Sequence, residues 1–300
     1  MTGPSTSDIT VNLEGLWLLQ ALLGIGRLAP ELRGRPYGQP RGNGWVSQHP
    51  GLAVLVEQGI ADEGGVVRDD IAARMAVLAA PDVEVVIIVC AGSMTVTPVI
   101  LDDPSTWRAI PDDQLRIVLA RRGTRWASAA RTGQVITIDD CAPVDHSRVE
   151  QLTVSALDSV HQVPAAAISA GNIPLDDMVA AMKTHGDAGT PAAKAAALRA
   201  VGLRGAALAE LGAALDHPVA EALMYARAYA DSDVMCSASV LDLRDTASGR
   251  VALYRLNPPP GGQQEWMTIA PATPAQITHA VATVIDSVGV RKWATHERMD

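Results

Sequence analysis

Two periods of hydrophobic and polar residues alternate along this chain, and together they predict an α+β protein. Apolar residues recur at helical spacing over 16–23, 50–58, 68–80, 145–160 and 273–288. Residues 83–90 are instead β-branched and almost continuously apolar, which is typical of a central strand. Shorter strands are predicted over 9–11, 94–101, 115–119, 125–131, 135–138, 237–243, 250–256 and 266–271. The Ala-rich stretch 174–229 is predicted to be helical, with Tyr225 and Tyr229 on one helix face.

The end of each half of the chain repeats one pattern. A strand over 135–138, the dipeptide Ala-Pro and a helix ending at Val160 are matched by a strand over 266–269, another Ala-Pro and a helix ending at Val288. Both helices carry apolar residues in the same i, i+3, i+4, i+7, i+8 and i+11 order, and Asp145 and Thr273 stand at the two N-cap positions.

The repeat predicts a duplicated fold. We expect two pseudo-twofold-related subdomains that form one central antiparallel sheet, with helical bundles packed at its ends. The expected subdomains are 1–160 and 161–300, and the second carries a helical insert at about 174–230. We expect them to form a single compact unit that shares one sheet.

Composition and charge narrow the classes of partner. The 300 residues are 48% hydrophobic, which is enough for a real core, and the formal net charge of -9 argues against nucleic acid and anionic membranes as partners. The three cysteines are widely spaced and form no CxxC, so neither a disulfide scaffold nor a zinc site is expected. No signal peptide is recognisable, and the longest apolar run, 83–91, is about half a membrane span. We therefore expect a cytoplasmic protein without direct membrane insertion.

Motifs for catalysis or cofactor binding are missing from the sequence. The seven histidines include no pair at i, i+4, and HExxH, GxSxG and a complete GxGxxG are absent. The Gly/Pro-rich stretch 34–44 lacks a GK[ST] ending, and five Asp-Asp pairs lie at predicted turns or helix starts. We expect no enzyme, cofactor or metal. The alternative is an α+β hydrolase-like enzyme whose site is assembled from scattered Asp and His residues, and a polar cleft with converging carboxylates of shifted pKa would favour it.

Long segments of the chain resemble one known family. In the first half they are DITVNLEG at 8–15, WLLQALL at 17–23, AARMAVLAAPD at 72–82 and VLARRG at 118–123. In the second half they are SASVL at 237–241, GRVALY at 249–254 and APATP at 270–274. The chain resembles the EspG family of ESX (type VII) secretion-associated chaperones, most closely the branch that serves the fifth ESX system, and the resemblance runs from about residue 8 to 296.

The resemblance implies a function and a set of binding residues. EspG proteins are cytosolic chaperones of mycobacteria that bind the helical PPE tip of PE–PPE heterodimers, keep them soluble and direct them to their ESX system. Other secretion-system components are further expected partners, and a regulatory adaptor is the alternative that differs only in its partner. Mapped onto this sequence, the partner-binding residues are Arg27, Trp107, Arg108, Arg227, Val234, Met235, Ser237 and Ser239. Trp107 and Arg108 lie in the polar loop 102–113, and Arg27 and Arg227 are expected to supply charge at the rim.

Overall fold

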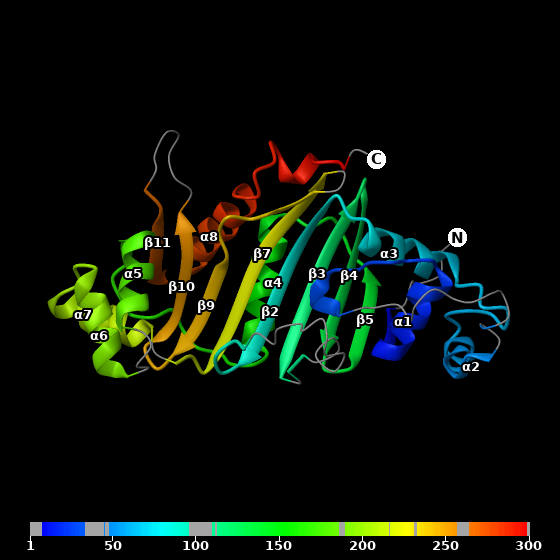
Figure 1. The fold of residues 1–300 in the computed structure, drawn as a ribbon, viewed down its shortest axis with the longest axis horizontal. Helices are drawn as coiled ribbons and strands as arrows, with labels where there is room; N and C mark the ends of the chain where they lie inside the picture. Colours follow the sequence, from blue (N-terminus) through cyan, green and yellow to red (C-terminus); the bar gives the residue numbers. More distant parts are fainter. Residues whose placement is uncertain are drawn as a thin grey trace.

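The computed structural model describes residues 8–33, 45, 48–95, 110–111, 113–185, 190–215, 217–230, 233–256 and 264–298. Its centre is an 11-stranded sheet in which every paired strand is antiparallel to its neighbour, as the ribbon in Figure 1 shows. The strands of the first half are β1 (Ile9–Asn12), β2 (Val83–Ala91), β3 (Gln114–Arg122), β4 (Arg125–Thr132) and β5 (Val135–Asp140). Those of the second half are β6 (Gly171–Pro174), β7 (Ala220–Ala230), β8 (Asp233–Cys236), β9 (Leu241–Thr246), β10 (Gly249–Leu256) and β11 (Trp266–Pro271).

The order of the strands confirms the predicted duplication. Read outward from the centre, one side runs β2-β3-β4-β5-β1 and the other runs β7-β9-β10-β11-β6, while β8 only extends the hairpin with β7. In each series the inner four strands follow chain order, if β8 is set aside. The outermost strand is the first strand of that half. The two central strands, β2 and β7, pair with each other along their whole shared length. The predicted α+β class with a shared antiparallel sheet is therefore confirmed.

Strand register assigns equivalent positions in the two halves. The correspondence between 135–138 and 266–269 extends to the neighbouring strands through the residues that lie opposite each other in the sheet. Val118 and Ala120 on β3 then correspond to Asp242 and Arg244 on β9, and Glu84 on β2 corresponds to Glu221 on β7. Because side chains alternate between the two faces of a strand, equivalent residues point to the same face of the sheet.

Helices cover the two faces unequally. On one face, α4 (His146–Asp158) and α8 (Pro274–Asp286) lie side by side across the middle of the sheet. On the other face, α1 (Leu13–Leu22), α2 (Pro50–Glu57) and α3 (Asp69–Ala79) gather at one end, and α5 (Leu175–His185), α6 (Pro191–Ala200) and α7 (Gly205–Ala214) gather at the other. Each group has its own hydrophobic cluster, so the molecule has one central and two terminal cores.

Side-chain caps set the start of the packing helices as predicted. The Asp145 carboxylate accepts a hydrogen bond from the Arg148 amide at 2.8 Å, and the Thr273 hydroxyl accepts one from the Gln276 amide at 3.3 Å. Each bond satisfies one of the amide groups that have no partner inside the first helical turn. The two helices therefore begin at equivalent places in the repeat.

Each packing helix leads into a segment that crosses onto the other half. After α4, the chain passes β10, where the Arg250 amide donates to Pro164 O at 2.8 Å and the Ala166 amide donates to Arg250 O at 2.9 Å. Gly249 has a φ of +108°, and a Cβ atom there would lie 2.6 Å from the Cα atom of Ala166. Glycine is therefore required at this crossing.

After α8, the chain returns to the first half. Trp293, in the short 3-10 helix η5 (Trp293–Thr295), packs on Trp126 with ring centroids 5.9 Å apart. Arg121 on β3 donates to the carbonyl oxygen of Trp293 at 3.5 Å. The two crossings tie the halves to each other reciprocally.

Two predicted elements need correction, and the short strands β6 and β8 were not predicted. The stretch 174–229 is not helical throughout, because 220–230 form strand β7. Tyr225 and Tyr229 therefore lie on a strand and not on a helix face. Alanine is used on β7 because Ala220, Ala222, Ala226 and Ala228 are fully buried beneath α4 and α8, where only small side chains fit, and this packing overrides the helical propensity of alanine.

The second correction concerns the start of a strand. The strand predicted over 237–243 begins only at Leu241, because the backbone before it turns away from β7 after β8. The short edge strand β6 lacks any hydrophobic alternation, so the sequence pattern gave no sign of it. Most of the strand predicted over 94–101 lies outside the described residues. Among the described helices, none combines the length and the apolar character that crossing a membrane requires.

Candidate partner-binding groove

A groove lies on the sheet face opposite α4 and α8, at the point where no helix of the first half reaches. It is bounded by β7, β9, β10 and β11 beneath and by α5 and α6 at the side, and its volume is about 980 Å³. Its walls are mostly apolar, with Leu175, Met178, Val179, Leu198, Leu215, Leu223, Leu253 and Met267 among the lining residues. Val179 is 58% exposed at the mouth, so an apolar surface is open to a partner there.

Charged residues form the floor of this groove. Glu221 on β7 stands directly across from Arg244 on β9, and Asp242 precedes Arg244 by two residues on the same face. The Arg244 guanidinium lies 2.7 Å from the Asp242 carboxylate and 3.1 Å from the Glu221 carboxylate. The amide of Met94, just beyond β2, donates to Glu221. We call Glu221, Asp242 and Arg244 the floor triad.

The environment of the floor triad shifts its protonation. Burial raises the pKa of Asp242 to about 7, the Arg244 charge opposes this, and the nearby Glu221 carboxylate adds to the rise. Burial would lower the pKa of Arg244, but its two carboxylate partners outweigh burial and raise that pKa. The floor therefore carries one permanent positive charge and two acids, one of which is partly protonated at neutral pH.

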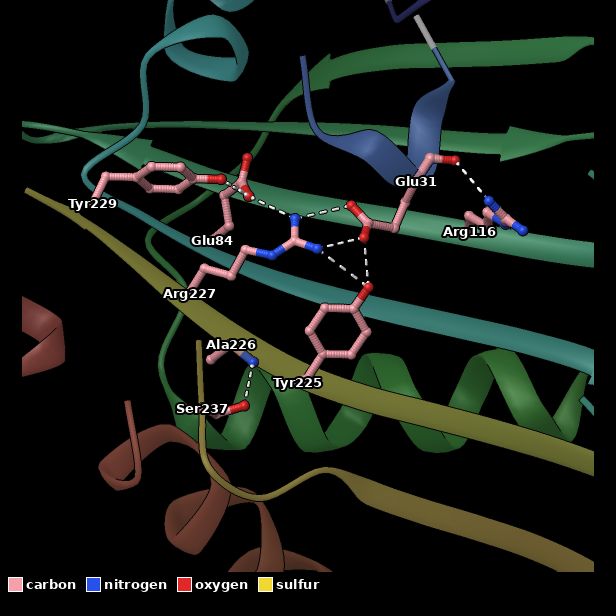
Figure 2. Close-up of polar contacts among 8 residues, drawn as sticks. All are labelled: Glu31, Glu84, Arg116, Tyr225, Ala226, Arg227, Tyr229 and Ser237. Atoms are coloured by element: carbon pink, nitrogen blue, oxygen red, sulfur yellow. Dashed lines mark hydrogen bonds and ion pairs between the residues drawn. The ribbon is translucent and has the colours of Figure 1, made fainter. Parts of the chain in front are cut away.

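A second polar cluster lies near the opposite end of β7, around Arg227 (Figure 2). Its guanidinium contacts Glu31 through two nitrogens, one at 2.9 Å, and reaches Glu84 at 3.4 Å. The Tyr225 hydroxyl donates to Glu31 at 2.6 Å, and the Tyr229 hydroxyl donates to Glu84 at 2.5 Å. Glu31 belongs to the short 3-10 helix η1 (Pro30–Leu32), so the cluster fastens η1 onto the two central strands.

The two glutamates of this cluster have opposite pKa shifts. Burial raises the pKa of both, but for Glu31 the hydrogen bonds and the charge of Arg227 outweigh burial and leave its pKa lowered. For Glu84 burial prevails and the pKa is raised. Converging carboxylates of shifted pKa are what the enzyme alternative requires, but neither residue lines the groove, and they are only 8% and 1% exposed. Among the described residues, the cluster is therefore a buried network of ion pairs and hydrogen bonds.

Arg227 was expected to supply charge at the rim of the binding surface, but it lies buried in this network. Arg227 is 9% exposed, and its guanidinium is held by the carboxylates of Glu31 on η1 and Glu84 on β2. Among the described residues, no group of three or more His, Cys, Asp or Glu side chains is placed to hold a metal ion.

The other predicted binding residues are spread over several places. Val234 pairs with Tyr229 and so faces the side of the groove, whereas Met235 pairs with Ala228 and packs on the central core beneath α8. Arg27 is exposed in the connection between α1 and η1, four residues before Glu31. Trp107 and Arg108 lie outside the described residues.

The two predicted serines support neighbouring backbone. The Ser237 hydroxyl accepts from the Ala226 amide at 3.2 Å, as Figure 2 shows. The Ser239 hydroxyl accepts from the Arg255 amide at 2.9 Å, its own amide donates to the Ser287 hydroxyl, and Ser239 also lines the groove. Ser239 is therefore the predicted residue that the structure brings to the groove, although it is only 2% exposed.

The floor triad was not predicted from the sequence, although a signal for it exists. In the run LDLRD at 241–245, apolar and charged residues alternate with the period of a strand that has one buried face. Glu221 was hidden because its strand reads as part of an Ala-rich helix. Only the pairing of β7 with β9 brings the three residues together.

Comparison with known proteins gives a consistent result. The model of the EspG family matches residues 12–283. The chain is 44% identical to the ESX-5 secretion-associated protein EspG5 of Mycobacterium marinum, over 98% of each chain, and 44% identical to the protein of the same name from Mycobacterium tuberculosis, again over 98% of each. Among solved structures, the Mycobacterium tuberculosis type VII secretion system chaperone EspG5, in complex with a PE25–PPE41 dimer, matches with a TM-score of 0.83 and 42% identity, over 97% of this chain and all of that one.

Proposed function

Because the chain belongs to the EspG family, we propose that it is a cytosolic chaperone for PE–PPE heterodimers of a type VII secretion system. In this role it binds the helical PPE tip, keeps the dimer soluble and directs it to its secretion system. The match to a solved chaperone that holds a PE25–PPE41 dimer, across nearly the whole of both chains, is the observation that carries the proposal.

The groove is our candidate for the part of the chain that receives the client. An amphipathic helix tip buries its apolar side chains best in a concave apolar surface with a few polar groups. The groove provides this combination, because its walls are leucine, methionine and valine and its floor carries the floor triad. Its volume of about 980 Å³ is large enough for several side chains at once.

A binding role agrees with the chemistry of the site better than catalysis does. The two converging glutamates are enclosed by their own network, and the two carboxylates of the floor triad both pair with one guanidinium. A general acid or base needs to reach a substrate atom, and a nucleophile needs an adjacent base. We infer that the protein has no catalytic activity.

A charge placed on the groove wall tests the proposed function. Val179→Asp puts a carboxylate at the mouth of the groove, which a bound apolar tip would bury without a partner, so we expect affinity to fall about 10-fold or more. Val66→Asp is the matched control, because Val66 is 67% exposed on the loop before α3, away from the groove. The measurement is titration calorimetry with purified PE25–PPE41 dimer.

The outcomes separate function from placement. If the wild-type chain binds neither this dimer nor any co-expressed PE–PPE pair, the chaperone function is wrong. If wild type binds and Val179→Asp binds equally well, the function stands and the groove is not the site. A loss of affinity in Val66→Asp that equals the loss in Val179→Asp would also remove the groove from consideration.

A further inference from the structure

We propose that Arg244 recognises backbone carbonyl groups at the C-terminal end of a client helix that enters the groove. The inference rests on the proposed function and adds to it the chemical group that the floor of the groove selects. It makes Arg244 a specificity-determining residue, distinct from the apolar walls that supply most of the buried area.

The geometry leaves one arm of Arg244 available. Its Nε donates to Asp242 at 2.8 Å, and its Nη2 lies 2.7 Å from Asp242 and 3.1 Å from Glu221. Within the described part of the chain, Nη1 has no hydrogen-bond partner, and the side chain is 27% exposed in the groove. A guanidinium clamped on two sides loses little further freedom when its third side binds an acceptor.

The charges around Arg244 favour a neutral acceptor. Two carboxylates already surround the guanidinium, so the floor offers a strong donor without a net positive charge. A carboxylate or phosphate on the client would be repelled by Glu221 and Asp242, whereas a carbonyl oxygen would not. Burial raises the pKa of Asp242 and the neighbouring Glu221 carboxylate adds to the rise, so a further negative charge in this floor is disfavoured.

Helix ends supply carbonyls of this kind. The last four carbonyl groups of an α-helix have no partner within the helix. A tip that inserts into an apolar groove removes these groups from water, and each one left without a donor is destabilising. A fixed guanidinium donor on the floor, surrounded by apolar walls, satisfies a helix C-terminus and the apolar side chains around it.

The duplicated half shows that these charges are tied to the open face. The positions equivalent to Asp242 and Arg244 are Val118 and Ala120, which are fully buried in the core with α1–α3. These two sheet positions are thus apolar where helices cover them and charged where the groove lies open, whereas the third member of the floor triad, Glu221, has an acidic equivalent in the first half, the buried Glu84. A purely structural ion pair would not need to face an open groove.

The test compares substitutions at Arg244 with a substitution at an arginine outside the groove. Arg244→Met removes the donor and keeps the apolar stem, and Arg244→Lys keeps the charge but shortens the fork to a single nitrogen. We expect both to weaken binding of PE25–PPE41 dimer about 10- to 100-fold, as for a hydrogen bond from a charged group. Arg148→Met is the matched control, since Arg148 is an exposed arginine on α4, on the face opposite the groove, and donates a hydrogen bond to Gln151 at 2.7 Å. There we expect a change of less than about threefold.

Salt identifies the acceptor. For a carbonyl, the ratio of mutant to wild-type Kd should stay constant between about 0.05 and 0.5 M NaCl, whereas an anionic acceptor would make the ratio shrink as salt rises. Thermal unfolding checks that each variant is folded, and Arg244→Lys decides the matter if the methionine variant is not. Wild-type affinity in Arg244→Lys, or a ratio that shrinks with salt, overturns the inference. Absence of binding by the wild type would instead overturn the proposed function.

Discussion

The two halves of the sheet differ in chemistry at equivalent positions of the same face. In the first half, Val118 and Ala120 on β3 are fully buried and belong to the core formed with α1–α3. In the second half, the equivalent Asp242 and Arg244 on β9 line the groove, because α5–α7 pack farther out, on β6, β10 and β11. One backbone plan thus forms a closed core on one side and the floor of an open groove on the other.

At these two pairs of equivalent positions, the placement of the covering helices decides the residue type more than the strand does. Equivalent residues share backbone geometry, hydrogen-bonding pattern and orientation. What differs is whether a helix removes the face from water. At these two positions a charge beneath the helices would be buried without a partner, whereas in the groove the charged groups pair with each other and stay partly exposed.

The largest effect on the free energy of unfolding is expected when the residue types of the two halves are exchanged. Val118→Asp buries an unpaired carboxylate beneath α3, so we expect a loss of about 4 kcal/mol or more in the free energy of unfolding. Asp242→Val leaves Glu221 and Arg244 as a balanced pair, and we expect a change within about 1 kcal/mol. Urea unfolding at neutral pH measures both. Similar destabilisation by the two substitutions would show that the faces are equally closed.

The pH dependence of stability provides a second test, which concerns Asp242 on the floor of the groove. Its folded-state pKa is raised to about 7 from an ordinary 3.8, so the group contributes stability that is fully present below about pH 3.8 and lost as pH rises through 7. Between about pH 5 and 8, wild type should therefore lose on the order of 2 kcal/mol relative to Asp242→Asn, which cannot titrate there. Glu31 and Glu84 titrate in both proteins, so their contributions cancel in the difference.

The stability difference is measured from denaturant unfolding curves at several pH values. Glu84→Gln is the reference variant, because Glu84 is a buried acid that does not line the groove. Parallel pH profiles for wild type and Asp242→Asn would mean that the floor of the groove is not desolvated in the free chain.

The smallest expected effects come from the helix caps, where the halves are most alike. Asp145→Ala and Thr273→Ala each remove one N-cap hydrogen bond, so each should cost about 1 kcal/mol. The aspartate should cost more, because its bond is 2.8 Å and not 3.3 Å long and its charge interacts with the helix dipole. Thermal or urea unfolding of the two variants gives the comparison. A cap effect in one half alone would show that the two helices do not support the sheet equally.

Local patterns carried much of the fold. The strand over 83–90, the meander before α4 and the two capped helices follow from period, β-branching and cap residues, and they lie where predicted within a few positions. Prediction failed for β7, because the alanines that a crowded face requires are also good helix formers. It also failed for Arg227, whose place among two glutamates depends on contacts between residues up to 196 positions apart.

The sequence alone shows that the chain has two related halves, which elements end each half, and which family it belongs to. These three features depend on residues close together in the chain or on long matched segments. Only the tertiary structure decided where the open face lies and which residues form its floor. Glu221, Asp242 and Arg244 meet because β7 pairs with β9, and they face a groove because the helices of the second half pack farther from the centre than those of the first. Pairing and covering are properties of distant segments, so no local pattern records them.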